Sequence, residues 1–373
     1  LMGTTAVWLR RRTLEGADAW EQPGFESEET LPLEGLTAGG PGAGHSPARR
    51  PWHAKLPLGA AVLLLLWGGW GVWGYKPAWL DRAAYVQFLD VGQGDGILIR
   101  TGSGKHLLVD TGGTVGFSKP GEEWKRRRDP YEIGRKLLVP LLKQRGVREL
   151  DALVLTHLDA DHIGGAEAVL RDIPVRAIVW NGTWKDGALA ERLFRAAEKR
   201  GIPVYAAKSG ALWNIDESAR LEVVYPSGSA GFGLSDSKLP QLDKQNEASL
   251  VLLLALYGRN FLLPGDAEAT AEAEIVGKLS ADVRAVPIDV LKAGHHGSKT
   301  STTADWLAYW KPADVVVSVG RRNLYGHPHP DVVARIVGAG STLLRTDLNG
   351  EIQYRIAPGG QIERREKRSF AYK

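Results

Sequence analysis

The sequence predicts a mixed α/β domain that begins near residue 81 and is preceded by a membrane helix and a disordered segment. From residue 85 onward, short apolar runs of strand length alternate with stretches of helical period. Several of these apolar runs end at an aspartate or a histidine close to a glycine turn. The chain has 373 residues, enough for one domain of about 250 to 300 residues with appendages.

Composition narrows the kinds of site and partner. The formal net charge is +4, a mild basic balance that favours polyanionic partners without requiring them. The chain contains no cysteine, which excludes disulfides and a thiolate-bound structural zinc.

The first 75 residues differ from the rest of the chain. Residues 1–55 are predicted to be a disordered linker, because residues 14–50 mix acidic residues, glycine, proline and serine without apolar periodicity. Residues 56–75 carry no charge and have Trp67, Trp70 and Trp73 toward one end. About 20 such residues span a bilayer, so we predict a transmembrane helix. A secretory signal peptide and a buried core helix are the alternatives.

The flanking charges predict an orientation for this helix. Arg49, Arg50 and Lys55 precede the run, whereas only Lys76 and Arg82 follow it closely. By the positive-inside rule, the downstream domain is expected at the cell membrane on the extracytoplasmic side. The chain starts Leu1-Met2 and is expected to be part of a longer product with further spans upstream.

The predicted α/β domain covers residues 81–357, and residues 358–373 are predicted to be a basic tail. A glycine- and serine-rich loop, 226–243, is expected near a substrate. The last two strands, 342–345 and 351–356, are expected to pair. The first two predicted strands, 85–91 and 97–100, form a hairpin. The other predicted strands are 105–110, 152–155, 177–180, 202–206, 221–225, 250–256, 315–319 and runs that start at 261 and 290. The predicted helices are 136–145, 188–200, 268–279, 330–338 and one after residue 165.

The strongest site motif lies between residues 156 and 165. His157, Asp159, Asp161 and His162 fall within six consecutive residues, between an apolar strand and a glycine turn that opens a helix. Imidazole and carboxylate together suit zinc or manganese, and an oxygen-rich set favours manganese or magnesium. The alternative is a solvated acidic loop with incidental histidines.

Four other strand ends carry similar side chains. Asp110, Asp266, the His295-His296 pair and His327 each follow an apolar run and precede a turn. Strand ends of this kind can meet at one sheet edge, and an aspartate shared between two ions about 3.5 to 4 Å apart is the usual arrangement for displacement at phosphorus. Two metals are therefore expected, and Asp266 must lie within ~10 Å of His162.

Taken together, these motifs resemble a known family. The stretch from Phe88 to Asp95, the 156–165 motif, Gly265-Asp266, His295-His296-Gly297-Ser298 and the stretch from Asn323 to Pro328 are similar to the C-terminal domain of the ComEC competence proteins, which has the metallo-β-lactamase fold. The likeness covers residues 85–357. It implies a four-layer αββα sandwich and a metal-dependent nuclease that acts on incoming DNA beside other components of an uptake channel.

The resemblance also implies a ligand set. His157, Asp159 and Asp266 would hold one ion, and Asp161, His162, Asp266 and His296 the other. Asp159 replaces the second histidine of the general HxHxDH motif, and no histidine lies between 162 and 295 to act as the third-motif ligand. The first site is therefore expected to be weaker and richer in oxygen, which favours Mn²⁺ over Zn²⁺, with Asn246 or Ser249 lining the gap.

The expected reaction is attack of a metal-activated water on a phosphodiester. The remaining candidates fall into four roles. His295 and His327, beside the catalytic Asp161, would assist the leaving oxygen. Ser298 and Asn323 would donate hydrogen bonds to the phosphate, and Lys125 and Arg126 of the basic run 125–128 would contact the DNA backbone. Asp95 and Asp110 would orient the metal ligands through hydrogen bonds without touching the metal. Ser298 is equally a helix N-cap candidate, and the basic run a solvated face. Which of His295 and His296 faces the metal is left open.

Two other functions stay compatible with the sequence. One is a phosphoesterase acting on a choline-phosphate ester or a wall polymer. The other is a DNA-binding module whose metal site is structural or only partly occupied. A β-lactamase is not expected, because the first metal site lacks a set of three histidines.

Overall fold

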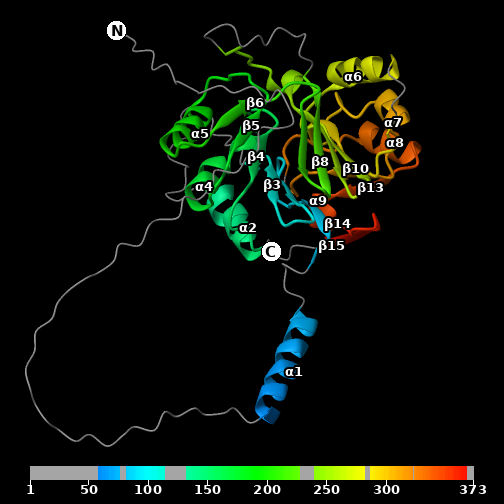
Figure 1. Cartoon of the computed structure of the whole chain (residues 1–373). Helices are drawn as coiled ribbons and strands as arrows, with labels where there is room; N and C mark the ends of the chain where they lie inside the picture. The colour runs from blue at the N-terminus through cyan, green and yellow to red at the C-terminus, as the bar shows by residue number, and fades with distance from the viewer. Residues whose placement is uncertain are drawn as a thin grey trace, which may run out of the picture. The chain divides into compact units, whose positions relative to one another are not determined.

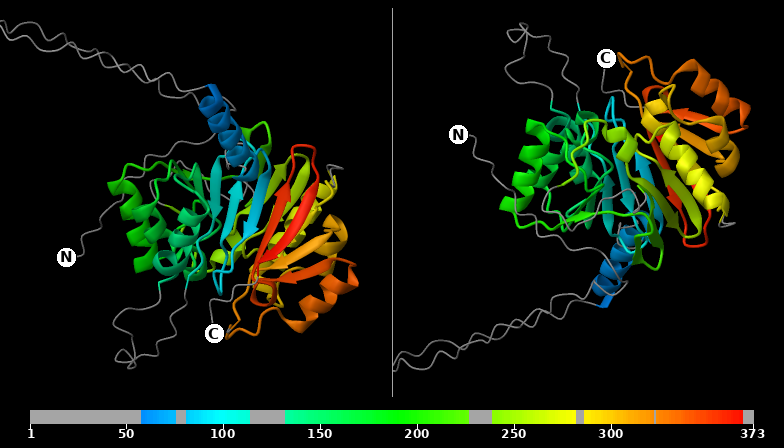
Figure 2. Two further views of the ribbon diagram at one scale, coloured as in Figure 1. Left: turned by 90° about the horizontal axis from the view of Figure 1, so that it is seen from below. Right: turned by 90° about the horizontal axis from the view of Figure 1, so that it is seen from above.

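Two β-sheets lie face to face and helices cover their outer faces (Figures 1 and 2). This arrangement is seen in a computed structural model, which describes residues 58–75, 81–113, 132–226, 239–281, 286–321 and 323–367. Residues from Arg82 onward form one unit, and helix α1 (Leu58–Tyr75) belongs to another and is described by itself. The mixed α/β sandwich agrees with the predicted fold class.

The first sheet has eight strands in the order β15-β14-β1-β2-β3-β4-β5-β6. Strands β14, β1, β2 and β3 pair antiparallel, and β3 to β6 pair parallel. The bounds are β1 (Ala84–Phe88), β2 (Ile97–Arg100), β3 (His106–Val109), β4 (Ala152–Leu155), β5 (Ile178–Trp180), β6 (Val204–Ala206), β14 (Glu351–Ile356) and β15 (Ile362–Lys367).

The second sheet repeats this plan with seven strands in the order β13-β12-β11-β10-β9-β8-β7. Strands β7 to β10 pair antiparallel, and β10 to β13 pair parallel. The bounds are β7 (Leu212–Asp216), β8 (Ala219–Tyr225), β9 (Val251–Leu256), β10 (Arg259–Leu263), β11 (Val290–Lys292), β12 (Asp314–Val317) and β13 (Thr342–Arg345). Parallel strands buried on both faces explain the apolar runs of β4 and β12 in the sequence.

Helices close the two outer faces. One apolar cluster joins the first sheet to the π-helical turn η3 (Gly134–Leu138) and helices α2 (Val139–Gln144), α4 (Ala166–Asp172) and α5 (Ala188–Lys199). Another joins the second sheet to α6 (Ala269–Ala281), α7 (Ala304–Trp310) and α8 (Pro330–Gly338). A third cluster fills the space between the sheets. The short helices are α3 (Ala160–Ile163), η4 (Gln245–Ala248), η5 (Gly294–Gly297) and α9 (Thr346–Asn349).

Three sequence expectations are corrected. Strands β13 and β14 do not pair, because β13 lies beside β12 in one sheet and β14 lies between β1 and β15 in the other. Residues 362–367 of the predicted tail form β15, an edge strand whose charged side chains protect it from further pairing and hid its strand character. Strand β7 and helix α7 were not predicted.

The predicted membrane span over residues 56–75 is not supported. Helix α1 has 18 residues, and in the described parts of the chain no helix combines the length and hydropathy needed to cross a bilayer.

Several other predictions fall outside the described residues. They concern the disordered linker 1–55, the basic candidates Lys125 and Arg126, most of the loop 226–243, and residues 368–373.

Candidate metal centre

The site forms where parallel strands of both sheets end. Asp110 follows β3, the His157–His162 segment follows β4, Asp266 follows β10, and His296 follows β11. Pairs β3·β4 and β10·β11 are parallel, so their carboxyl ends point to the same edge. The two sheets thereby bring residues more than 100 positions apart into one pocket.

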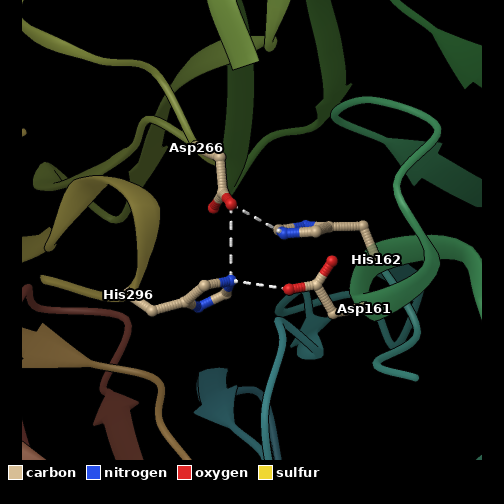
Figure 3. A group of neighbouring side chains, drawn as sticks. All are labelled: Asp161, His162, Asp266 and His296. Carbon is tan, nitrogen blue, oxygen red and sulfur yellow. Dashed lines mark ion pairs between the residues drawn. The ribbon is translucent and has the colours of Figure 1, made fainter. Parts of the chain in front are cut away.

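Four side chains converge in this pocket: Asp161, His162, Asp266 and His296 (Figure 3). The Oδ2 atom of Asp266 lies 3.2 Å from Nε2 of His162 and 3.4 Å from Nε2 of His296. The Oδ2 atom of Asp161 lies 3.4 Å from the same His296 nitrogen. One donor atom from each of the four lies within 4.8 Å of all the others, a spacing that a single cation can bridge.

The unpartnered atoms of the pocket fit a metal ion. The Nε2 atoms of His157, His162 and His296 are buried and have no hydrogen-bond partner among the described residues. Burying an unpaired polar atom costs roughly 1 to 3 kcal/mol, so three such nitrogens at one place indicate a missing ligand. Imidazole nitrogens with carboxylate oxygens are a donor set that zinc and manganese both accept.

The ring of His162 is held from behind. Its Nδ1 atom donates to Oδ2 of Asp110 at 2.8 Å, and Asp110 in turn accepts from the backbone N–H (2.8 Å) and the hydroxyl (2.6 Å) of Thr156. This chain of bonds leaves Nε2 of His162 as the free lone pair facing the pocket. Asp110 therefore lies where it can orient the His162 ring. Thr156, which holds Asp110 in place, is a further residue of this hydrogen-bonded chain that was not predicted from the sequence.

His296, rather than His295, faces the cluster. The Nδ1 atom of His296 donates to the backbone carbonyl of Ser318 at 3.0 Å, which turns Nε2 toward Asp161 and Asp266. His295 points elsewhere: its Nδ1 atom lies 2.9 Å from Oε1 of Glu268, and its Nε2 atom lies 3.8 Å from Oδ2 of Asp266. The sequence left open which of His295 and His296 faces the cluster, and the backbone of the η5 turn determines that it is His296.

That turn is strained. His295 (φ 43°) and His296 (φ 54°) are consecutive residues in left-handed conformation. Each costs of order 1 to 3 kcal/mol for a residue with a side chain, and such strain concentrates at functional sites. Its effect here is to send two adjacent imidazoles in different directions.

A fully buried lysine, Lys292, lies beneath the cluster. Its ammonium donates to the carbonyl of Gly265 at 2.6 Å, lies 3.3 Å from Oδ1 of Asp266, and forms a close ion pair with Oδ2 of Asp95. Asp266 therefore presents Oδ1 to Lys292 and Oδ2 to the pocket. The sequence signal for this residue was a single charge inside the apolar run of β11, which indicates a buried partner.

Asp95 also lies behind the cluster, as its predicted role requires. Its Oδ1 atom is 3.6 Å from Nδ1 of His296, and its Oδ2 atom is 4.0 Å from Nδ1 of His162. The neighbouring Gly94 explains the glycine-rich turn after β1. Its φ is +113°, and a Cβ there would lie 2.0 Å from the carbonyl oxygen of Asp161, so only glycine permits this approach.

The other two predicted ligands lie beside the cluster. The His157 ring centroid is 4.0 Å from that of His162, and its Nε2 atom is 4.0 Å from Oδ2 of Asp159. Oδ1 of Asp159 accepts from the Lys185 ammonium at 2.6 Å. Neither His157 nor Asp159 belongs to a compact ligand group among the described residues. The His/Asp arrangement is compatible with a dinuclear site whose first position is less complete.

Three residues of the cluster, Asp161, Asp266 and His296, line a cavity of about 320 Å³, together with Gln93, Asp159, Lys185, His295, Tyr325 and His327. Ser298 and Asn323, predicted phosphate donors, are not among its lining residues. The Ser298 hydroxyl bonds to that of Thr300 at 3.0 Å, and Asn323 uses its amide to close its own turn. The N-cap of α7 is Thr303, so Ser298 does not cap that helix.

The pKa values show how charge is distributed. Burial alone lowers the pKa of His296, but Asp266 and Asp161 outweigh it and raise this pKa to about 9. The pKa of His162 is likewise raised, against burial, by Asp266 and Asp110. Burial lowers the pKa of His327 to about 4, with help from His295 and His296, so this ring is neutral at pH 7. Without a cation, protons therefore occupy two of the ligand nitrogens.

This proton occupancy predicts a pH-dependent metal affinity. A cation must displace the proton from His296, whose pKa is about 9, so affinity rises as pH rises toward that value. We expect Zn²⁺ or Mn²⁺ binding between pH 6.5 and 8.5 to tighten about tenfold per pH unit for each proton displaced from His162 and His296. Isothermal titration calorimetry in two buffers of different ionisation enthalpy measures both affinity and proton release. An affinity independent of pH, without proton release, would contradict this charge distribution.

Comparisons with known proteins agree with this geometry. Residues 89–321 match the family model of the metallo-beta-lactamase superfamily. ComE operon protein 3 of Bacillus subtilis (strain 168) is 34% identical over 277 residues, 74% of this chain and 33% of that protein. Competence protein ComA of Neisseria gonorrhoeae is 34% identical over 313 residues, 83% of this chain and 36% of that protein.

The chain thus spans about a third of the length of these curated relatives. Among solved structures, CmlA, a diiron beta-hydroxylase from Streptomyces venezuelae, is 13% identical with a TM-score of 0.44, over 74% of this chain and 54% of that one. The family-model match covers more than half of the chain and includes every strand end that builds the pocket. The chain therefore belongs to the metallo-beta-lactamase superfamily, and its curated homologues include ComE operon protein 3 and competence protein ComA of the ComEC family.

Proposed function

We propose that this domain is a metal-dependent phosphodiesterase that hydrolyses DNA during its uptake in natural transformation. One observation carries the proposal: Oδ2 of Asp266 lies within 3.4 Å of two buried imidazole nitrogens that have no hydrogen-bond partner among the described residues, at a cavity that Asp266 and His296 line. Such a centre binds cations that act on phosphate esters. The printed names of the relatives, a competence protein and a ComE operon protein, supply the link to DNA uptake.

The proposed ligands divide into two sets that share Asp266. Asp161, His162 and His296 complete one set, and His157 and Asp159 the other. When bound, Mn²⁺ or Zn²⁺ ions would supply charge neutralisation on the phosphate oxygens and would lower the pKa of a coordinated water. The set made of His157, Asp159 and Asp266 is the less complete one, and its carboxylates favour manganese over zinc at that position.

The remaining cavity residues position the substrate. Lys185 is the only lysine or arginine among the described residues that line the cavity, so we assign to it the phosphate contact predicted for Lys125 and Arg126. His295, oriented by Glu268, presents Nε2 toward the cavity and is the better proton donor to a leaving oxygen. His327 is neutral at pH 7 and suits this role less. The location outside the cytoplasm and the partner proteins of an uptake channel stay predictions.

Loss and restoration of cleavage by metal test the proposal. The whole chain is stripped with a chelator and assayed on single-stranded DNA, plasmid and a small diester, with Mn²⁺ or Zn²⁺ added back. We expect Mn²⁺ to restore DNA cleavage, and both Asp161→Ala and His162→Ala to abolish it. The control is His106→Gln, because His106 opens β3 at the end opposite Asp110.

Three outcomes would contradict the proposal. Unchanged cleavage by both pocket variants would place the activity elsewhere. Activity on small diesters without DNA cleavage would favour a phosphoesterase of another substrate. Salt-dependent DNA binding without cleavage under either metal would favour the binding module.

A further inference from the structure

The turn between β12 and α8 presents an exposed aromatic ring at the cavity. Tyr325 is 46% exposed, and the adjacent Leu324 is 78% exposed. Tyr325 also belongs to the cavity lining, together with Asp161 and Asp266 of the cluster. A planar apolar surface therefore borders the place where a phosphate would lie, and phosphodiester hydrolysis by itself does not require such a surface.

The ring is held in a fixed position. Asn323 clamps the turn by donating to the carbonyls of Gly320 (3.1 Å) and His327 (2.9 Å) and by accepting from the His327 N–H (2.8 Å). Tyr325 stacks on His327 with ring centroids 5.7 Å apart and planes at 26°. His327 packs edge-on against His295 at 5.7 Å, and His295 borders Asp266. A series of rings thus runs from the metal cluster to the exposed tyrosine.

We propose that Tyr325 is a stacking platform for an unpaired nucleobase of the strand whose phosphate enters the cluster. This inference rests on the proposed nuclease function and gives it a substrate class, single-stranded nucleic acid. Aromatic side chains that hold single strands stack on bases without regard to sequence, whereas bases in a duplex already stack on each other. Lys185 in the same cavity suits the anionic backbone that accompanies the base.

A phosphocholine ester is less well matched by these residues. A quaternary ammonium group is bound by aromatic cages. Here one exposed tyrosine shares its cavity with the Lys185 cation. Burial, and then Asp161 and Asp159, raise the pKa of Tyr325, so its phenol stays neutral and does not repel a phosphate.

Binding of a fluorescent oligonucleotide tests the platform. The full chain is titrated with a single-stranded phosphorothioate DNA that carries 2-aminopurine, and with the same strand carrying an abasic site instead. We expect wild type and Tyr325→Phe to quench the 2-aminopurine fluorescence and to bind with equal affinity. Tyr325→Leu is expected to lose the quenching and to bind roughly 5- to 100-fold more weakly.

The abasic strand makes the test specific. Wild type is expected to bind it as weakly as Tyr325→Leu binds the intact strand, and the leucine variant is expected to show no further loss. Circular dichroism and the melting temperature establish that both variants fold. Equal affinity and equal quenching in wild type and Tyr325→Leu would overturn the inference, as would competition by phosphocholine that depends on Tyr325.

Failure of the platform and failure of the nuclease proposal are distinguishable. If Tyr325→Leu binds and cleaves single-stranded DNA like wild type, the stacking role is wrong and the nuclease stands. If wild type cleaves no DNA with any metal, the nuclease proposal falls, and the inference that depends on it falls too.

Discussion

Replacing Asp266 by asparagine is expected to lower metal-dependent DNA cleavage by about 10³-fold or more. Asp266 Oδ2 approaches Nε2 of both His162 and His296, at 3.2 and 3.4 Å. An amide keeps the shape but loses the charge that holds a divalent cation. Since a bound metal contributes several kcal/mol of transition-state stabilisation, and each 1.36 kcal/mol is tenfold in rate, a loss of this size follows.

The matched control for this variant is Asp289→Asn. Asp289 precedes β11 and pairs with Arg259 at 3.0 Å, at the end of the strand opposite to the cluster. The two variants are compared by metal content after dialysis and by initial rates of DNA cleavage. Asp266→Asn should lose both, and Asp289→Asn should keep both. Full metal content and rate in Asp266→Asn would exclude Asp266 as the shared ligand.

Replacing Lys292 by methionine is expected to lower the free energy of unfolding of the metal-free protein by about 3 to 5 kcal/mol, as for other buried ion pairs that lose one partner. Lys292 is 0% exposed, and its ammonium lies between the Asp95 and Asp266 carboxylates. Methionine fills a similar volume but leaves those carboxylates buried without their cation. Added Zn²⁺ or Mn²⁺ should restore part of the loss, because the ion supplies positive charge to the other carboxylate oxygen of Asp266.

Denaturant unfolding with and without metal measures this effect. The control is Lys278→Met, which removes an exposed pair with Glu274 on α6 and should change the unfolding free energy by less than about 1 kcal/mol. Equal stability of Lys292→Met and wild type in the absence of metal would show that the buried ion pair does not stabilise the fold.

Much of the fold was predictable because apolar runs and turn residues mark strands and helices locally. Strand β2 and helix α8 begin and end where the sequence places them. Sheet membership was not predictable in the same way. Residues 342–345 and 351–356 have similar local patterns, yet they enter different sheets, because pairing depends on partners far away in the sequence.

The ligand cluster was predictable from one rule, that polar residues at parallel strand ends meet at a sheet edge. This rule located Asp161, His162, Asp266 and His296, which the structure brings together. It did not reveal which rings point inward, because the left-handed backbone of His295 and His296 decides this. Nor did it find residues that act through others, such as Thr156 and Glu268, whose partners lie 46 and 27 positions away.

Anomalous scattering from a metal-soaked crystal of the protein tests the central claim most directly. The cluster predicts an anomalous peak, with Zn²⁺ or Mn²⁺, bonded to Nε2 of His162, Nε2 of His296 and one carboxylate oxygen each of Asp161 and Asp266, at about 2.0 to 2.2 Å for zinc. A second peak beside His157 and Asp159, sharing Asp266, would complete the dinuclear site. A well-ordered pocket without any peak, under conditions where the metal is saturating, would contradict the account.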